Sequence, residues 1–374
     1  MLNVDEIWSM DTPIIHPEVL SREYGANVSV FDGSAFPTGT IKDVRNSVLL
    51  SRDIWLDEVV YTTISWGNNA RSLAVLARLI EQSTGMRGIA ATIIPSGYPG
   101  LRRDLEAEGA VVIEKSTRAL EREINDSELK QIVIDELNRQ GVRWSGNPSN
   151  IVNADTVELR NNSYAPLIEG FSKNIDYVFV PFGSGRTAKE IIHELIRQRG
   201  SSIPTFVCVE VEGKSVLRGK NITWDKTLTA YSTFRPDLEE LAKQYPGKIQ
   251  FMEVSERERD EEYTFLNREG INAEPAAALA FAGARKYKFP TPDANALIVN
   301  TGKGRIYERQ SALSAMAHSY LARVAAALLV SAGLYAGFCT KVYERQPLDP
   351  AIATYLRSTG DSNDLMIARG ISRF

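Results

Sequence analysis

The sequence predicts an α/β protein in which mostly parallel sheets are flanked by helices. Short apolar runs alternate with amphipathic segments of helical period along most of the chain, and this alternation is typical of βαβ units. The run IDYVFVPF (175–182) is almost uniformly apolar, as expected for a strand that is covered on both faces. The length of 374 residues is enough for two lobes around a cleft.

In the first part of the chain, the sequence pattern predicts three strands that alternate with two helices. A strand is expected at 59–65, followed by a helix over 69–85 whose apolar residues have helical spacing. A second strand, 88–95, precedes a helix over 99–110 that ends near a glycine. A third strand is expected at 111–115.

The region 116–172 is polar and the least regular, so we expect it to join or cap the lobes. No internal repeat or low-complexity tract is present. The expected order after this region is strand 175–182, helix 187–200, strand 204–213, helix 274–287 and strand 295–302.

The composition argues against several kinds of partner. Hydrophobic residues make up 43% and the net charge is −4, whereas a nucleic-acid-binding surface is basic. Cys208 and Cys339 are the only cysteines and His16, His193 and His318 the only histidines, so neither a disulfide framework nor a histidine-rich metal site is expected. The acidic start MLNVDEIWSMD lacks the apolar core of a secretory signal. We expect a cytoplasmic protein without a bound metal.

Residues 183–188 form a glycine-rich turn between an expected strand and an expected helix. Converging backbone N–H groups and the helix N-terminus would make an anion site there. The letters GSGRTA also fit the G-x-G-x-x-G/A dinucleotide fingerprint, with Glu210 or Glu212 as the ribose-binding acid. An NAD-dependent dehydrogenase, another phosphate ligand and a plain turn all remain open on this motif alone.

Four further stretches place reactive or polar residues at turns. PTGTIKD contains Lys42, SWGNNARSLA contains Asn68, AEPAAALAFAG contains Glu274, and NTGKG contains Thr301. Taken singly, each has an ordinary structural explanation such as a surface charge or a helix cap. An NAD enzyme has no use for this set. A pyridoxal-phosphate enzyme uses a lysine for the Schiff base, an anion loop for the phosphate, and an amide and a hydroxyl for the ring.

In this order the motifs resemble the fold type II pyridoxal-phosphate enzymes, the tryptophan synthase beta-like group, which includes threonine synthase, threonine dehydratase and cysteine synthase. The resemblance runs from about residue 12 to residue 304. Residues 37–43 follow the family pattern Asn-Pro-Thr-Gly-Ser-Phe-Lys-Asp-Arg from its proline onward, and residues 65–68 follow its Ser-x-Gly-Asn turn. The Glu274-Pro275-Ala276 helix start resembles that of threonine synthases and dehydratases, and Thr301 stands where threonine synthases place the hydroxyl that faces the pyridine nitrogen.

The resemblance implies two lobes with pyridoxal 5'-phosphate in the cleft between them. The large cofactor-binding lobe would comprise 1–45 and 165–374, and the smaller mobile lobe 46–164. Lys42 would be the catalytic Schiff-base lysine. The implied cofactor-binding residues are Asn68, Gly183, Ser184, Gly185, Arg186, Thr187, Glu274 and Thr301, and the implied substrate-binding residues are Thr38, Ser65, Trp66, Gly67 and Asn69.

Several residues depart from the family pattern. Phe36 replaces an asparagine, Val44 stands where arginine is common, and Trp66 fills the place of a small hydroxyl residue near the substrate carboxylate. Arg186 replaces a glycine of the phosphate loop. These changes leave the cofactor chemistry intact and leave the identity of the substrate open.

The expected activity is elimination or replacement at the β or γ carbon of an activated amino acid, as in threonine synthase. β-Replacement on an activated serine, as in cysteine synthase, is an alternative within the family. An NAD-dependent dehydrogenase and a non-catalytic binding protein that keeps the fold are alternatives of other classes; Phe36 and Trp66 would favour the binding protein.

The run 324–340 contains 17 residues without a charge, and Gly333 and Gly337 have G-x-x-x-G spacing. A membrane span needs about 20 strongly apolar residues, so we expect a buried or interface helix. The prediction is a soluble homodimer that binds a small amino acid and neither nucleic acid nor a membrane.

Overall fold

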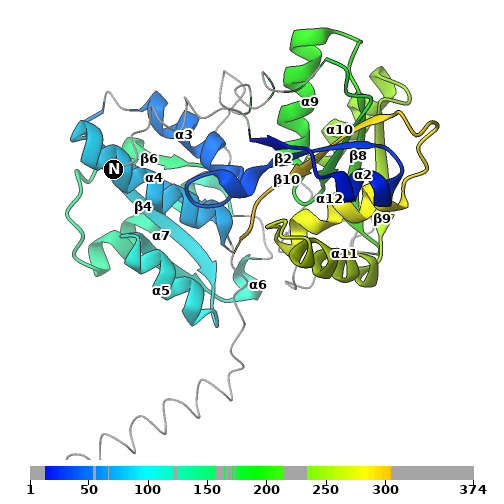
Figure 1. Ribbon diagram of the computed structural model, residues 1–374. Coiled ribbons are helices and arrows are strands. Elements are labelled where there is room, and N and C mark those ends of the chain that lie inside the picture. The colour runs from blue at the N-terminus through cyan, green and yellow to red at the C-terminus, as the bar shows by residue number, and fades with distance from the viewer. Residues whose placement is uncertain are drawn as a thin grey trace, which may run out of the picture. The chain divides into compact units, whose positions relative to one another are not determined.

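The computed structural model describes residues 13–53, 56–65, 67–120, 124–155, 164, 168, 171, 173–213 and 234–304 (Figure 1). All of them lie within one compact unit, residues 1–309. Trp66 and the run 324–340 lie outside the described residues. None of the helices that are described is long and apolar enough to cross a membrane.

The larger sheet has six strands in the order β1-β2-β10-β7-β8-β9. β1 is antiparallel to β2, and every other neighbouring pair is parallel. The last strand of the described residues, β10, lies between β2 and β7, so segments far apart in the chain meet at its carboxyl end. The strands are β1 (Ile14–Ile15), β2 (Asn27–Asp32), β7 (Tyr177–Pro181), β8 (Thr205–Val211), β9 (Ile249–Val254) and β10 (Asn295–Asn300).

Helices cover both faces of this sheet (Figure 1). Val178 and Val180 of β7 pack toward α9 (Arg186–Arg199) and α10 (Arg235–Gln244). Phe179, between them in the sequence, packs toward the other face. That face carries α2 (Glu18–Tyr24), α11 (Glu256–Arg268) and α12 (Pro275–Lys286). Side chains alternate between faces along a strand, so a strand covered on both sides is apolar throughout.

The smaller sheet has four parallel strands in the order β5-β4-β3-β6. One apolar cluster joins it to α3, α4 and α5, and a second joins it to α7. Its strands are β3 (Glu58–Ile64), β4 (Arg87–Pro95), β5 (Val111–Lys115) and β6 (Ile151–Asn153); the helices are α3 (Lys42–Arg52), α4 (Asn68–Thr84), α5 (Pro99–Ala107), α6 (Thr117–Leu120) and α7 (Asp126–Arg139). Two short 3-10 turns are Gly33–Ala35 and Pro148–Asn150.

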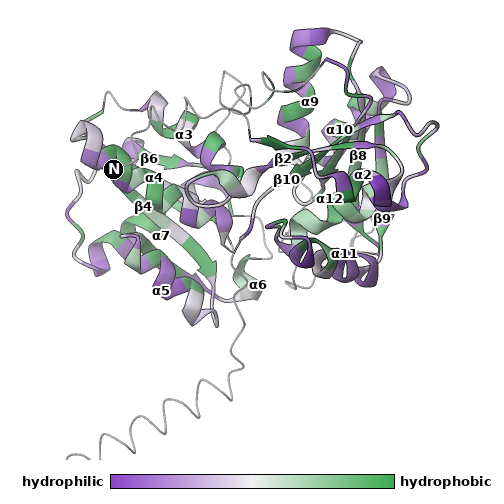
Figure 2. Cartoon of the chain, viewed as in Figure 1, coloured by the Kyte–Doolittle hydropathy of each residue, from purple (hydrophilic) through white to green (hydrophobic). Residues whose placement is uncertain are grey.

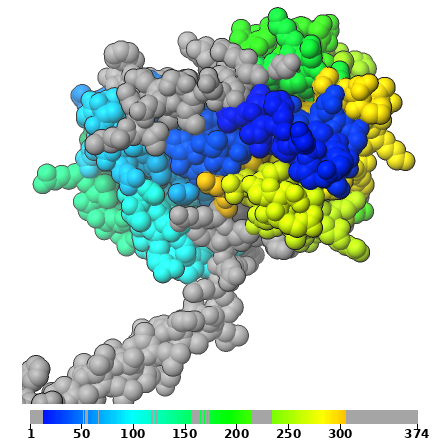
Figure 3. Space-filling model, viewed as in Figure 1, coloured from blue at the N-terminus to red at the C-terminus, as the bar shows by residue number. Residues whose placement is uncertain are grey.

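The hydropathy of the individual elements follows this layering. Figure 2 shows green, apolar strands and a largely purple α11. Figure 3 shows the dark blue N-terminal residues against the yellow-green residues of α11, and Tyr24 Oη of α2 donates a 2.6 Å hydrogen bond to Glu262 Oε1 of α11. The N-terminal segment therefore closes one edge of the larger sheet and one of its faces.

All ten elements that the sequence predicted by range are present, with ends that differ by at most three residues. The expectation of irregular structure across 116–172 was wrong in part, because α7 and β6 form there. α7 places Leu129, Val133 and Leu137 four residues apart on a buried stripe, and its many charged residues hide this stripe in the sequence. The predicted lobe boundary at 45/46 falls inside α3; the division into lobes stays a prediction.

Candidate active site

The predicted residues are brought together at the carboxyl ends of parallel strands. Asn68 begins α4 after β3, Arg186 begins α9 after β7, and Thr301 follows β10. Lys42 begins α3. Ligands of open α/β sheets bind at this edge because successive turns present side chains and helix N-termini there.

The amine of Lys42 lies at the start of α9. Lys42 Nζ donates a 3.0 Å hydrogen bond to Thr187 Oγ1, across 145 residues of sequence. Tyr164 Oη is 3.5 Å from the same Thr187 hydroxyl oxygen. Because Thr187 follows the glycine turn directly, the structure places a primary amine beside the predicted phosphate loop.

The loop before Lys42 is held closed by Asp43. Thr38 N–H donates to Asp43 Oδ2 at 2.7 Å, and the Thr38 hydroxyl donates to the other carboxylate oxygen. Burial raises the pKa of Asp43, whereas hydrogen bonds from Thr38 and Ser72 and the charge of Arg71 act in the opposite direction. In this structure Thr38, a predicted substrate-binding residue, is therefore engaged in shaping the lysine loop.

The glycine turn of residues 183–187 has the features of an anion site. Gly185 is the N-cap of α9 with φ of 85°, a conformation that favours glycine. Ser184 Oγ lies 3.4 Å from the N–H of Arg186. The first turn of α9 carries no acidic residue. Its N–H groups and partial positive charge, together with the Lys42 amine, favour a bound phosphate.

Asn68, Glu274 and Thr301 form a second cluster, around the Glu274 carboxyl. Asn68 Nδ2 donates to Glu274 Oε2 at 2.6 Å, and Thr301 Oγ1 donates to Glu274 Oε1 at 3.3 Å. Burial raises the pKa of Glu274, against the hydrogen bonds of Asn68 and Thr301 and the charge of Lys42. A Cβ added to Gly304 would lie 2.2 Å from Glu274 Oε2, so the NTGKG glycine leaves space for this cluster.

The turn after β3 is fixed by Ser65 and Asn69. Ser65 Oγ accepts hydrogen bonds from the N–H groups of Gly67 at 3.4 Å and Ala70 at 3.3 Å. Asn69 Nδ2 donates to Thr63 Oγ1 at 2.8 Å. The turn therefore enters α4 in a defined conformation next to the Asn68 amide.

A backbone contact that the sequence did not predict joins the lysine loop to the end of β10. Ile41 N–H donates to Thr301 O at 3.0 Å, and Lys303 N–H donates to Gly39 O at 2.9 Å. Gly302 has φ of 140°, and a Cβ there would lie 2.3 Å from Gly39 O. Only the glycine in NTG signalled this close approach. The contact sets the position of Thr301 relative to Lys42.

The described residues fit pyridoxal phosphate. They combine an amine, an anion-favouring helix start, and polar groups around one partly buried carboxyl, from segments between residues 42 and 301. The competing dinucleotide interpretation would use Glu210 to bind a ribose. Glu210 is instead buried and ion-paired with Arg235.

Comparison with known proteins identifies the class. A family model described as pyridoxal-phosphate dependent enzyme matches residues 9–302. The chain belongs to this family, is a pyridoxal-phosphate-dependent enzyme, and has the fold type II architecture that the motifs predicted.

Individual relatives vary in their chemistry. Threonine synthase of Halalkalibacterium halodurans is 26% identical over 293 residues, which is 74% of this chain and 76% of the relative. The structure of O-ureido-L-serine synthase has a TM-score of 0.56 at 16% identity, covering 80% of this chain and 90% of that one. Threonine deaminase isoform 2 of Solanum lycopersicum has a TM-score of 0.56 at 17% identity, covering 80% and 85%. The solved structures share the fold.

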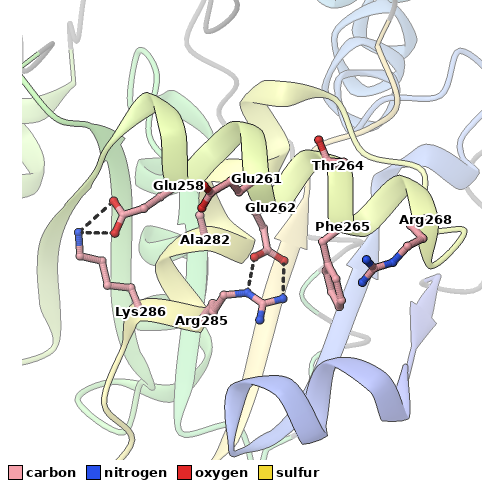
Figure 4. Close-up of a pocket in the computed structure, with 9 residues that line it drawn as sticks. All are labelled: Glu258, Glu261, Glu262, Thr264, Phe265, Arg268, Ala282, Arg285 and Lys286. Atoms are coloured by element: carbon pink, nitrogen blue, oxygen red, sulfur yellow. Dashed lines mark hydrogen bonds and ion pairs between the residues drawn. The ribbon is translucent and has the colours of Figure 1, made fainter.

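Charged and nucleophilic groups elsewhere are engaged in packing. A cavity of about 460 Å³ between α11 and α12 is lined by paired charges (Figure 4); in it Arg285 binds Glu262 and Lys286 binds Glu258. Burial raises the pKa of the Cys208 thiol to about 12, so it is not a nucleophile at neutral pH. Among the described residues no cluster of His, Cys, Asp and Glu could hold a metal ion.

Proposed function

We propose that the enzyme catalyses elimination or replacement at the β or γ carbon of an activated amino acid, as threonine synthase does. The observation that carries the proposal is the position of the Lys42 amine, 3.0 Å from Thr187 in the glycine turn. A base at this position is close to an anchored cofactor and can remove a proton from the substrate α carbon. The relationship to threonine synthase at 26% identity supports the same chemistry.

Pyridoxal phosphate, when bound, supplies an electron sink for the charge that develops at the α carbon. The residues of the chain would hold and orient it. The turn 183–187 and the α9 N-terminus would hold the phosphate, and Asn68 would donate to the ring hydroxyl. The neutral hydroxyl of Thr301 would face the ring nitrogen, where it cannot keep that nitrogen protonated as a carboxylate would. This arrangement favours rapid loss of a leaving group.

Glu274 would act between these ring-facing groups. Its carboxyl is partly buried and accepts hydrogen bonds from both Asn68 and Thr301, so it fixes the orientation of the amide and the hydroxyl. The segment from Ser65 to Asn69 would receive the substrate carboxylate, because it contains the N-terminus of α4 and such helix starts favour anions.

The test is a substrate screen on the full chain with pyridoxal phosphate. Release of phosphate from O-phosphohomoserine, with formation of threonine, is the expected result. Turnover of O-acetylserine with a sulfur nucleophile instead would favour β-replacement, and absence of any turnover across activated serines and homoserines would contradict the proposal. A homodimer and a cytoplasmic location complete the proposal; analytical ultracentrifugation tests the dimer.

A further inference from the structure

A buried arginine and a partly buried arginine bind consecutive carbonyl groups just beyond β6. Arg45 Nη2, from α3, donates to Ala154 O, and Arg186 Nη2, from α9, donates to Asp155 O. Arg45 lies three residues after Lys42, and Arg186 is the residue that replaces a glycine of the phosphate loop. The lysine helix and the phosphate-loop helix therefore both bind the end of one strand of the smaller sheet.

The two guanidinium groups share one carboxylate. Glu190 Oε1 lies 3.8 Å from Arg45 Nε and 3.8 Å from Arg186 Nη1. The side chains of Arg45 and Arg186 are only 2% and 15% exposed. Burial and the charge of Arg45 both lower the pKa of Arg186. The carboxylate of Asp155 also acts electrostatically on Arg186, so two carboxylates accompany the two guanidinium groups. A phosphate in the adjoining loop would add further negative charge beside Arg186.

Asp155 connects this arginine pair to the turn after β3. Its carboxylate accepts hydrogen bonds from Ile64 N–H at 2.7 Å and from Thr63 Oγ1 at 2.9 Å. Asn69 Nδ2 lies 3.4 Å from the same carboxylate. The carbonyl group of Asp155 is thus bound by Arg186 of the phosphate loop. Its carboxylate binds Thr63 and Ile64 before the turn and Asn69 after it.

We propose that Asp155 is a positioning residue, through which Arg186 couples an occupied phosphate loop to the positions of residues 63–65 and 67–69 around the turn after β3. The inference rests on the proposed function for the identity of that turn as the substrate-carboxylate site. A bound phosphate would strengthen the contact of Arg186 with the carbonyl of Asp155. The carboxylate of Asp155 would in turn keep Thr63 and Ile64 in place. Coupling of this kind is reciprocal and typically changes affinity by about 5- to 150-fold.

Amide hydrogen exchange tests the coupling without reference to turnover. The full chain is compared with and without saturating pyridoxal phosphate, and exchange is followed in peptides covering 59–70. In the wild type the cofactor should slow exchange at the Ile64 amide at least about fivefold. Arg186→Met should reduce this slowing to less than about twofold while the visible absorbance shows that cofactor is still bound. Arg257→Met is the matched control, because Arg257 is 86% exposed on α11, and it should behave as the wild type.

Asp155→Asn provides a second variant that keeps the backbone carbonyl for Arg186. It replaces one carboxylate oxygen by a donor, so the contacts to residues 63–69 cannot all form. Asp155→Asn should also lose the cofactor-dependent slowing of exchange in residues 59–70, while its cofactor affinity changes less than about threefold. Asp155→Glu should restore part of the slowing. A purely structural role would instead lower cofactor affinity and the melting temperature together.

The outcomes separate this inference from the proposed function. Wild-type exchange behaviour in Arg186→Met, with cofactor bound, would overturn the coupling and leave the proposed function standing. Absence of lysine-bound cofactor absorbance in the wild type would overturn both.

Discussion

Replacement of Gly185 by alanine should destabilise the phosphate loop for two separable reasons. Gly185 has φ of +85°, and a residue with a side chain in this conformation costs roughly 1–2 kcal/mol. The added Cβ would also lie 2.9 Å from Phe182 Cε2. That ring is fixed by an edge contact with Phe251, with centroids 5.5 Å apart, so it cannot move aside freely and overpacking adds about 1–3 kcal/mol.

Gly85 is the matched control for the backbone contribution. It is the C-cap of α4 with φ of 76° and ψ of −5°, close to the φ of 85° and ψ of −8° of Gly185, and it has no atom within 4 Å of an added Cβ. Gly85→Ala should therefore cost only the roughly 1–2 kcal/mol of the backbone conformation. The difference between the two variants, about 1–3 kcal/mol, measures the steric contact with Phe182.

Urea unfolding of the cofactor-free variants gives the free energy of unfolding of each, provided that their m-values agree with that of the wild type. Titration with pyridoxal phosphate gives the second readout. A helix start that binds an anion contributes up to ~2 kcal/mol, so Gly185→Ala should weaken cofactor affinity by up to about 30-fold and Gly85→Ala should leave it unchanged. Equal destabilisation by the two substitutions, or equal cofactor affinity, would refute the reasoning.

Three further outcomes are expected. Lys42→Ala should abolish the visible absorbance of lysine-bound cofactor and lower turnover by at least ~10²-fold; borohydride-dependent attachment of cofactor to this variant would identify another lysine. Burial raises the folded pKa of Glu274 above its ordinary value of 4.5, so ionisation costs the folded state more than the unfolded chain and stability falls as pH rises above 4.5 toward the folded pKa. Glu274→Gln should flatten this fall in urea unfolding of the cofactor-free protein, and an identical pH profile would show that Glu274 ionises freely. Trp66→Ser should change the relative rates across a donor panel, because it restores a small hydroxyl residue; identical ratios would make Trp66 a packing residue.

Local sequence patterns were sufficient for the elements that carry the site. The apolar run at β7, the glycine turn after it and the apolar stripe of α9 are adjacent in sequence, so periodicity and turn chemistry predict them together. α7 escaped prediction because its three buried residues are spaced among charges. The lysine loop was predicted from its residues, but its closure by Asp43 depends on a hydrogen bond to Thr38 that only the folded loop shows.

The meeting of distant residues was decided by the tertiary structure. Nothing local places Thr301 against the lysine loop; the insertion of β10 between β2 and β7 does so, and the Gly39–Gly302 approach completes it. The same holds for Arg186, whose partner at Asp155 lies 31 residues away on the other sheet. The sequence by itself determined the class of chemistry, because lysine, glycine turn, amide and hydroxyl are fixed by residue type and order. Their distances follow from strand order and helix packing, because these arise from burial of apolar faces across the whole chain rather than from neighbouring residues.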